Sequence, residues 1–176
     1  LGFAAQGLGS TRDTLLYSAS LSRGYAFNDR RDSLLLAMSL SGRAADGSSE
    51  NRLLSAEAKY YQRISSRRLF FASLRADSGS KLDVDNQLLL GGDNGLRGYP
   101  LRYQAGSKSV LLSVEQRYFT DYYPARLFRV GGAMFFDIGK VWGDNAFGTP
   151  SRGTLKDIGF GLRLGNSRSG LGNVIH

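Results

Sequence analysis

The sequence lacks cysteine altogether and holds a single histidine, His176, at its last position. The absence of cysteine excludes disulfide bonds, thiolate metal sites and a cysteine nucleophile within these 176 residues. Because the one histidine stands at the end of the chain, we do not expect histidine-based acid–base catalysis. From the absence of cysteine and the single terminal histidine, we expect neither enzyme chemistry nor a bound metal or cofactor.

Long apolar runs are also missing, and only 3 of the 176 residues are proline, against 23 glycines. No stretch of about 18 uncharged apolar residues exists, which excludes a transmembrane helix. No signal peptide is recognisable at Leu1, and residues 172–176 read as the start of a strand. We therefore expect the chain to be a piece of a longer protein.

Positive charge is in excess, with 23 lysines and arginines against 15 acidic residues and a formal net charge of +8. Such a charge suits nucleic acid. It equally suits an anionic lipid surface, since many of the cations fall in predicted turns. Charge alone does not choose between these two partners.

What the sequence does contain is a period-two alternation of polar and apolar residues along almost its whole length. In residues 32–43, for example, Leu34, Leu36 and Met38 fall on one face, and Ser39 and Ser41 on the other. The pattern predicts roughly eight or nine strands, separated by turns near residues 28–29, 45–48, 65–66, 121–124 and 143–145. The clearest predicted strands are residues 13–24, 32–43, 50–62, 67–77, 109–119, 128–142 and 155–164.

The predicted strands are long, at roughly 10–13 residues, whereas strands of soluble proteins cluster near about 5–6 and membrane-spanning strands need about 9–11. The less apolar face is rich in serine, glycine and charged residues, as in a polar lumen. Aromatic residues recur near strand ends, as in interfacial girdles. We predict an all-β antiparallel transmembrane β-barrel; a soluble barrel or sandwich with one wet face is the alternative.

A glycine-rich segment, residues 91–100, interrupts the alternation. Its glycines and Pro100 exclude a helix. Arg97 stands between Leu96 and Gly98. The neighbouring glycine lets the backbone pass close to other strands while the long arginine side chain reaches a carboxylate. The plain alternative is a solvated hairpin loop with a surface arginine.

Three further charged residues follow this loop on predicted strands. Glu115 and Arg117 are two apart and so share a face, and Asp137 lies on the next strand. Arg97 can fold back and pair with Asp137 or Glu115 through its planar guanidinium. Arginines so close would keep both carboxylates ionised and unable to act as acids, so we expect no enzyme here.

The order of these motifs resembles the bacterial surface antigen superfamily of outer-membrane assembly and secretion barrels, which includes BamA, TamA and the two-partner secretion transporters. The resemblance is specific over residues 91–163 and extends to residues 1–80 in pattern only. The loop motif of that superfamily is matched by Gly91, Gly92, Leu96, Arg97, Gly98 and Tyr99. Its inward-facing strand motifs are matched by Glu115 and Arg117, by Phe135, Asp137 and Gly139, and by the glycine-patterned residues 159–163.

The resemblance implies that residues 1–176 are one transmembrane segment, the C-terminal half of a barrel of about sixteen strands. It implies a long loop, residues 78–107, folded into the lumen, with Arg97 anchored against Asp137 and Glu115 nearby. No part of the chain resembles the POTRA domains of that superfamily. Closure by these strands alone would leave little room for such a loop.

The implied function is insertion, assembly or translocation of proteins at the bacterial outer membrane, without enzymatic activity or cofactors. The expected partners are outer-membrane lipid, lipopolysaccharide, a substrate polypeptide, and POTRA domains or a partner chain outside this segment. The alternative is a passive pore, or a membrane anchor for a fused passenger such as a lipase domain. A soluble nucleic-acid binder would need aromatics on its charged face, and most lie elsewhere, so we expect no nucleic acid.

Overall fold

The computed structural model describes most of the chain, and that part is all-β apart from one short 3-10 helix. The described residues are 1–4, 13–29, 31–45, 47–122, 128–148, 152–166 and 174–175. Among them, no helix is long and apolar enough to cross a membrane. Of the positions expected in turns, Asp46, Tyr123 and Pro124 lie outside the described residues, as does His176.

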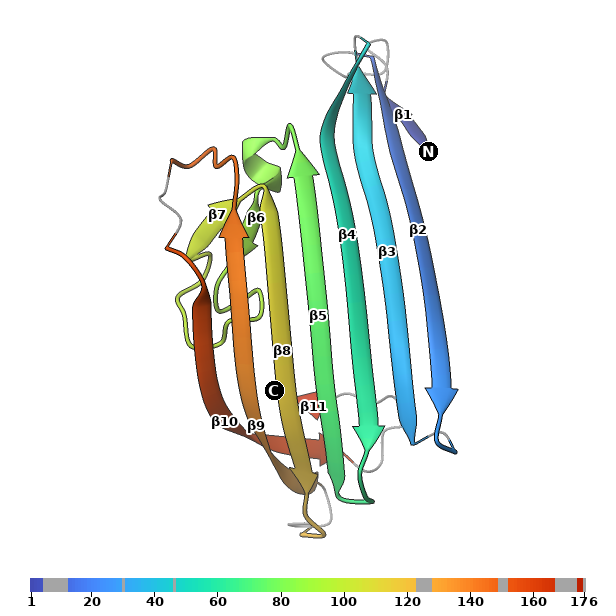
Figure 1. Ribbon diagram of the computed structural model, residues 1–176, viewed down its shortest axis with the longest axis vertical. Coiled ribbons are helices and arrows are strands. Elements are labelled where there is room, and N and C mark those ends of the chain that lie inside the picture. The colour runs from blue at the N-terminus through green and yellow to red at the C-terminus, as the bar shows by residue number, and fades with distance from the viewer. Residues whose placement is uncertain are drawn as a thin grey trace.

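The main element is a nine-stranded antiparallel sheet in which each strand pairs with its neighbours in the order β1-β2-β3-β4-β5-β8-β9-β10-β11 (Figure 1). Seven of the strands are long, with 12 to 16 residues each. The long strands are β2 (Thr14–Phe27), β3 (Asp32–Ala45), β4 (Ser48–Arg63), β5 (Arg68–Ser80), β8 (Lys108–Phe119), β9 (Phe128–Trp142) and β10 (Leu155–Asn166). The all-β antiparallel prediction is therefore confirmed.

The sheet is open over the described residues. The short strands β1 (Gly2–Ala4) and β11 (Val174–Ile175) stand at its two edges, each paired on one side. The strands that the structure describes do not close into a barrel, which leaves the predicted barrel as a proposal.

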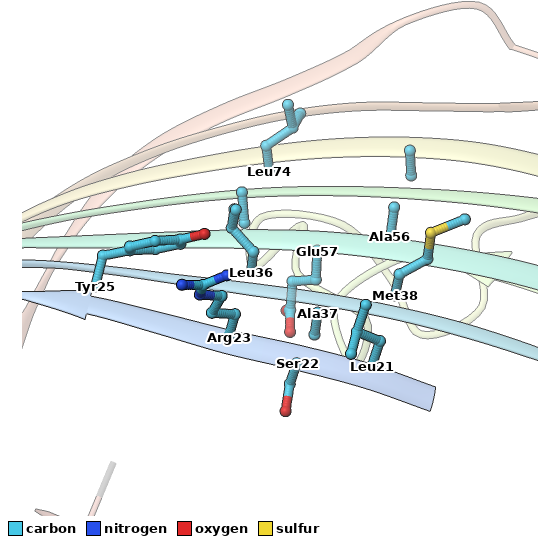
Figure 2. A pocket seen from close by; sticks show the side chains of 12 residues that line it. Leu21, Ser22, Arg23, Tyr25, Leu36, Ala37, Met38, Ala56, Glu57 and Leu74 are labelled. Atoms are coloured by element: carbon cyan, nitrogen blue, oxygen red, sulfur yellow. The ribbon is translucent and has the colours of Figure 1, made fainter. Parts of the chain in front are cut away.

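Alternation gives the sheet two unlike faces. Around a shallow depression of about 530 Å³, Leu21, Leu36 and Leu74 project from one face, while Ser22 and Glu57 point the other way (Figure 2). The register continues the first set across the sheet, because Leu36, Ala58, Leu74, Leu112 and Ile138 are successive cross-strand partners. We call this side the apolar face and the opposite side the polar face.

The two ends of the strands are distinguished by the long connection between β5 and β8. At one end β2 and β3 are joined by a short turn in which Asn28 and Asp29 both have positive φ, 52° and 55°, a conformation that asparagine and aspartate adopt more readily than most residues. At the same end β4 and β5 are joined by residues 64–67. At the other end β5 and β8 are joined by residues 81–107. We call these the turn side and the loop side.

The connection of residues 81–107 is ordered and lies against the polar face. It contains a 3-10 helix (Val84–Asn86) and the two-stranded antiparallel sheet of β6 (Leu88–Leu90) and β7 (Gln104–Gly106). A small apolar core joins it to the main sheet, formed by Leu90, Leu96, Val141 and Leu155 with Leu111 packed beside them. The loop expected from residue 78 begins at residue 81, because β5 continues to Ser80.

The start of this connection is held by an ion pair to β3 and hydrogen bonds to β4. Asp83 lies 2.9 Å from Nη1 of Arg43 and accepts a 2.7 Å hydrogen bond from Nδ2 of Asn51. Arg43 also pairs with Glu50 at 3.0 Å. The connection is thus attached to the main sheet at its start as well as through its apolar core.

Candidate functional site

The glycine-rich segment folds into a compact turn held by its own backbone. The amide of Gly92 donates to the carbonyl of Pro100 at 3.1 Å, and the amide of Leu96 donates to the carbonyl of Gly91 at 3.0 Å. The amide of Tyr99 donates to the carbonyl of Leu96 at 3.0 Å. Since the Leu96 side chain is fully buried in the core under the loop, its neighbour Arg97 is held in a fixed direction.

Arg97 bridges two carboxylates on neighbouring strands of the polar face. Its Nη2 lies 3.1 Å from Oε2 of Glu115 on β8, and its Nε lies 3.4 Å from Oδ2 of Asp137 on β9. Glu115 is 1% exposed and Asp137 is fully buried. The sequence predicted a pairing with one or the other, and the structure shows both. A planar guanidinium suits this task because its donors point in several fixed directions.

Glu115 is the centre of a larger cluster, since three guanidinium groups converge on it. Nε of Arg117 lies 2.9 Å from Oε1, and Arg163 of β10 also contacts Oε1 through Nη2. A buried carboxylate is tolerated when such contacts replace its lost hydration. Arg163 was not among the predicted site residues; the alternation placed it on the polar face, but the pairing of β9 with β10 was needed to bring it here.

Two aromatic rings lie beside the arginines. Cζ of Arg97 is 4.0 Å from the centre of the Phe135 ring, and Cζ of Arg117 is 5.0 Å from that of Phe71. Both distances suit a cation–π contact. Gly159 on β10 makes room for the Phe135 ring, because a Cβ at position 159 would come within 2.6 Å of it.

Strand β10 also holds the loop backbone. The amide of Gly98 donates to Oδ2 of Asp157 at 2.9 Å. The Tyr99 hydroxyl donates to the carbonyl of Lys156 at 3.0 Å, and the amide of Lys156 lies 3.2 Å from the same hydroxyl. A Cβ at position 98 would approach Cβ of Asp157 to 3.0 Å, so the close approach favours glycine. Sequence reasoning did not single out Asp157, which lies directly opposite Asp137 in the register.

The structure therefore brings the predicted charged residues into one cluster. Arg97, Glu115, Arg117 and Asp137 meet on the polar face, and Gly139 lies on β9 beneath Leu90 of the loop, whose Cδ2 would be 3.1 Å from an added Cβ. With Arg163 and Asp157 the cluster has three guanidiniums and three carboxylates, so the formal charges balance. We call these six charged residues the ionic cluster.

The ionic cluster is suited to holding a loop against a wall. It joins the loop to β8 and β10 by charge-assisted hydrogen bonds, which are the strong class of hydrogen bond, and to β9 by the ion pair of Arg97 with Asp137. Over the described part of the chain, no group of three or more histidine, cysteine or acidic residues is placed to hold a metal ion. No protein-family model matches the chain, and no curated protein matches it, so its function is argued from the geometry.

Proposed function

We propose that this chain is part of an outer-membrane β-barrel that inserts, assembles or translocates other proteins. The observation that carries the proposal is the loop arginine, Arg97, bound to two buried carboxylates on the polar face of a sheet whose other face is apolar and exposed. The sequence resemblance to the surface antigen superfamily agrees with this arrangement.

The apolar face supports a lipid environment. Its large side chains are open to solvent on strands far apart in the sheet, with Leu21 76% exposed on β2 and Phe160 86% exposed on β10. Monomeric soluble proteins rarely expose apolar patches larger than a few hundred Å². Tilted strands of about 9–11 residues cross the hydrocarbon layer, and the long strands here have at least 12.

The polar face supports a lumen. Serine and charged side chains line it, and the loop of residues 81–107 lies over it. Further strands pairing with β1 and β11 would close the barrel and remove both sheet edges, which otherwise invite association with other chains. In such a barrel the ionic cluster fixes the loop inside and braces β8, β9 and β10 against one another.

The membrane assignment is tested by expressing the full-length protein in a bacterium with an outer membrane. We expect it in the outer-membrane fraction, extracted only by detergent, with faster gel mobility before heating than after. A protein that stays soluble without detergent would overturn the proposal. Full-length sequence upstream of Leu1 separates the candidate roles: POTRA repeats support assembly or secretion, and a hydrolase domain supports the anchor.

The role of Arg97 is tested with Arg97→Gln and with Arg102→Gln, a matched control whose side chain is exposed in the same loop. We expect Arg97→Gln to increase protease cleavage of the loop in intact membranes and to reduce the yield of folded client barrels. Arg102→Gln is expected to leave both unchanged. Normal cleavage and full activity in Arg97→Gln would contradict an anchoring role.

A further inference from the structure

Three lysines stand on the apolar face at the loop side of adjacent strands. They are Lys108 on β8, Lys140 on β9 and Lys156 on β10, and all three are exposed. Lys108 pairs with Trp142, two residues from Lys140, and Lys156 pairs with Ile138, also two residues from Lys140. Consecutive members are thus diagonal neighbours, about 7–8 Å apart. We call them the lysine row.

The lysine row follows the rim of the sheet instead of descending into its apolar band. From β8 to β10 it steps toward the turn side by two residues at each strand. The strand ends on the turn side are staggered in the same direction. Phe27 is the last residue of β2, but successive cross-strand partners lead from it to Gln116 on β8 and Met134 on β9, which lie inside those strands. The lysine row therefore runs parallel to the line of the strand ends.

An apolar strip lies next to the row on the turn side. Leu112 and Ile138 are cross-strand partners there, and Ile158 and Phe160 on β10 are 76% and 86% exposed. Nζ of Lys140 lies 5.9 Å from the centre of the Trp142 ring, a residue type common at membrane–water interfaces. None of the described outward side chains of β8, β9 and β10 is acidic.

The two rims of the apolar face differ in chemistry. On the turn side, Phe27, Tyr60 and Phe70 form a row of rings whose centres are 6.3 Å apart, and Tyr118 lies further along. On the loop side of β8, β9 and β10 the rim instead carries the lysine row, with the ring of Trp142 beside it. Positive charges that border an apolar surface match a lipid whose head group is anionic.

We propose that the lysine row binds the phosphate groups of a multi-chain phosphorylated glycolipid of the lipid A type, with its acyl chains lying along Leu112, Ile138 and Ile158. The row offers three cations at a regular spacing, which fits more than one phosphate on a single rigid head group. The strip beneath spans three strands and so accommodates several chains. This inference rests on the proposed function, because it requires the apolar face to lie in a membrane.

The test compares the triple variant Lys108→Gln, Lys140→Gln, Lys156→Gln with the wild-type full-length protein in detergent. The matched control is Arg68→Gln, a cation on the same face at the opposite rim, paired with Tyr118. Native mass spectrometry measures retention of bis-phosphorylated lipid A, of the same lipid without phosphates, and of phosphatidylglycerol. Heat-modifiable gel mobility confirms that each variant is folded.

We expect the wild-type protein and Arg68→Gln to retain bis-phosphorylated lipid A at least about tenfold better than either of the other lipids, and the triple variant to lose this preference. Equal retention of lipid A by the folded triple variant would overturn the inference. Equal retention of phosphatidylglycerol and lipid A would also overturn it, by showing an unselective anionic surface. Absence of the wild-type protein from membranes would instead refute the proposed function itself.

Discussion

At the scale of single residues, the unusual feature is the sharing of one buried carboxylate, Glu115, by three arginines. A charge buried to this extent is stable only while its partners are in place. The arginines depend on Glu115 in turn. Arg117 and Arg163 both contact its Oε1, so both lose a partner when this carboxylate is removed.

We expect Glu115→Gln to destabilise the folded protein by about 3–5 kcal/mol, because it leaves guanidiniums without their countercharge. The measurement is the denaturant midpoint, followed by loss of heat-modifiable mobility. Glu57→Gln is the control: Glu57 lies on the same face, paired with Lys59 at 2.8 Å, but its side chain is 33% exposed. A similar loss of stability in both variants would show that the ionic cluster contributes no more to the stability of the fold than the partly exposed pair of Glu57 and Lys59.

Residue-level prediction succeeded where side chains two apart share a face. Alternation alone put Glu115 and Arg117 together and directed attention to Asp137. It could not find Arg163 or Asp157 as partners, since their contacts depend on the register of β9 with β10, a pairing between strands separated by residues 143–154. Register is set by tertiary contacts as well as by the local pattern.

At the scale of elements, glycines of β10 decide how closely its neighbours approach. Gly159 and Gly161 both lie on the polar face, two residues apart. A Cβ at 159 would meet the Phe135 ring at 2.6 Å, whereas a Cβ at 161 would meet nothing within 4 Å. The two positions therefore form a natural pair for comparison.

We expect Gly159→Ala to displace the Phe135 ring and with it the guanidinium of Arg97, so that protease cleaves the loop faster. Gly161→Ala is expected to leave cleavage at the wild-type rate. Limited proteolysis of the full-length protein in vesicles measures both. Unchanged cleavage in the first variant would mean that the ring does not position Arg97.

The long strands were predicted from alternation with ends within a few residues of those observed; residues 32–43, for instance, became β3, Asp32–Ala45. The small sheet of β6 and β7 was not predicted. Its strands have three residues each, too few for a period-two pattern to stand out, and they are joined across the glycine-rich turn.

At the scale of the whole molecule, the two faces predict opposite responses to charge. We expect Leu74→Lys on the apolar face to oppose folding into lipid vesicles by about 2–4 kcal/mol if it lies near the bilayer midplane. Ser73→Lys, one residue earlier on the polar face, is expected to fold as the wild type does. Folding yield in vesicles, read from gel mobility, is the measurement.

The outcome separates two environments. In water, Leu74 is 48% exposed, and a lysine there would be tolerated as well as at Ser73. Equal folding of both variants would therefore contradict a lipid-facing role. Strand length and face chemistry could be predicted from the sequence. Closure into a barrel could not, because the proposed barrel requires strands beyond β1 and β11.

The six residues of the ionic cluster lie in one interval of the sequence, from Arg97 of the loop to Arg163 of β10, whereas the start of the loop is held by Arg43 of β3 and Asn51 of β4. This interval supplies both the guanidiniums and the carboxylates of the ionic cluster, with none contributed by β2, β3 or β4. Exchanging the whole interval between related chains would transfer every ion pair of the cluster, whereas a junction placed inside the interval would separate arginines from their carboxylate partners. Recombination of such proteins is accordingly constrained in its choice of crossover points.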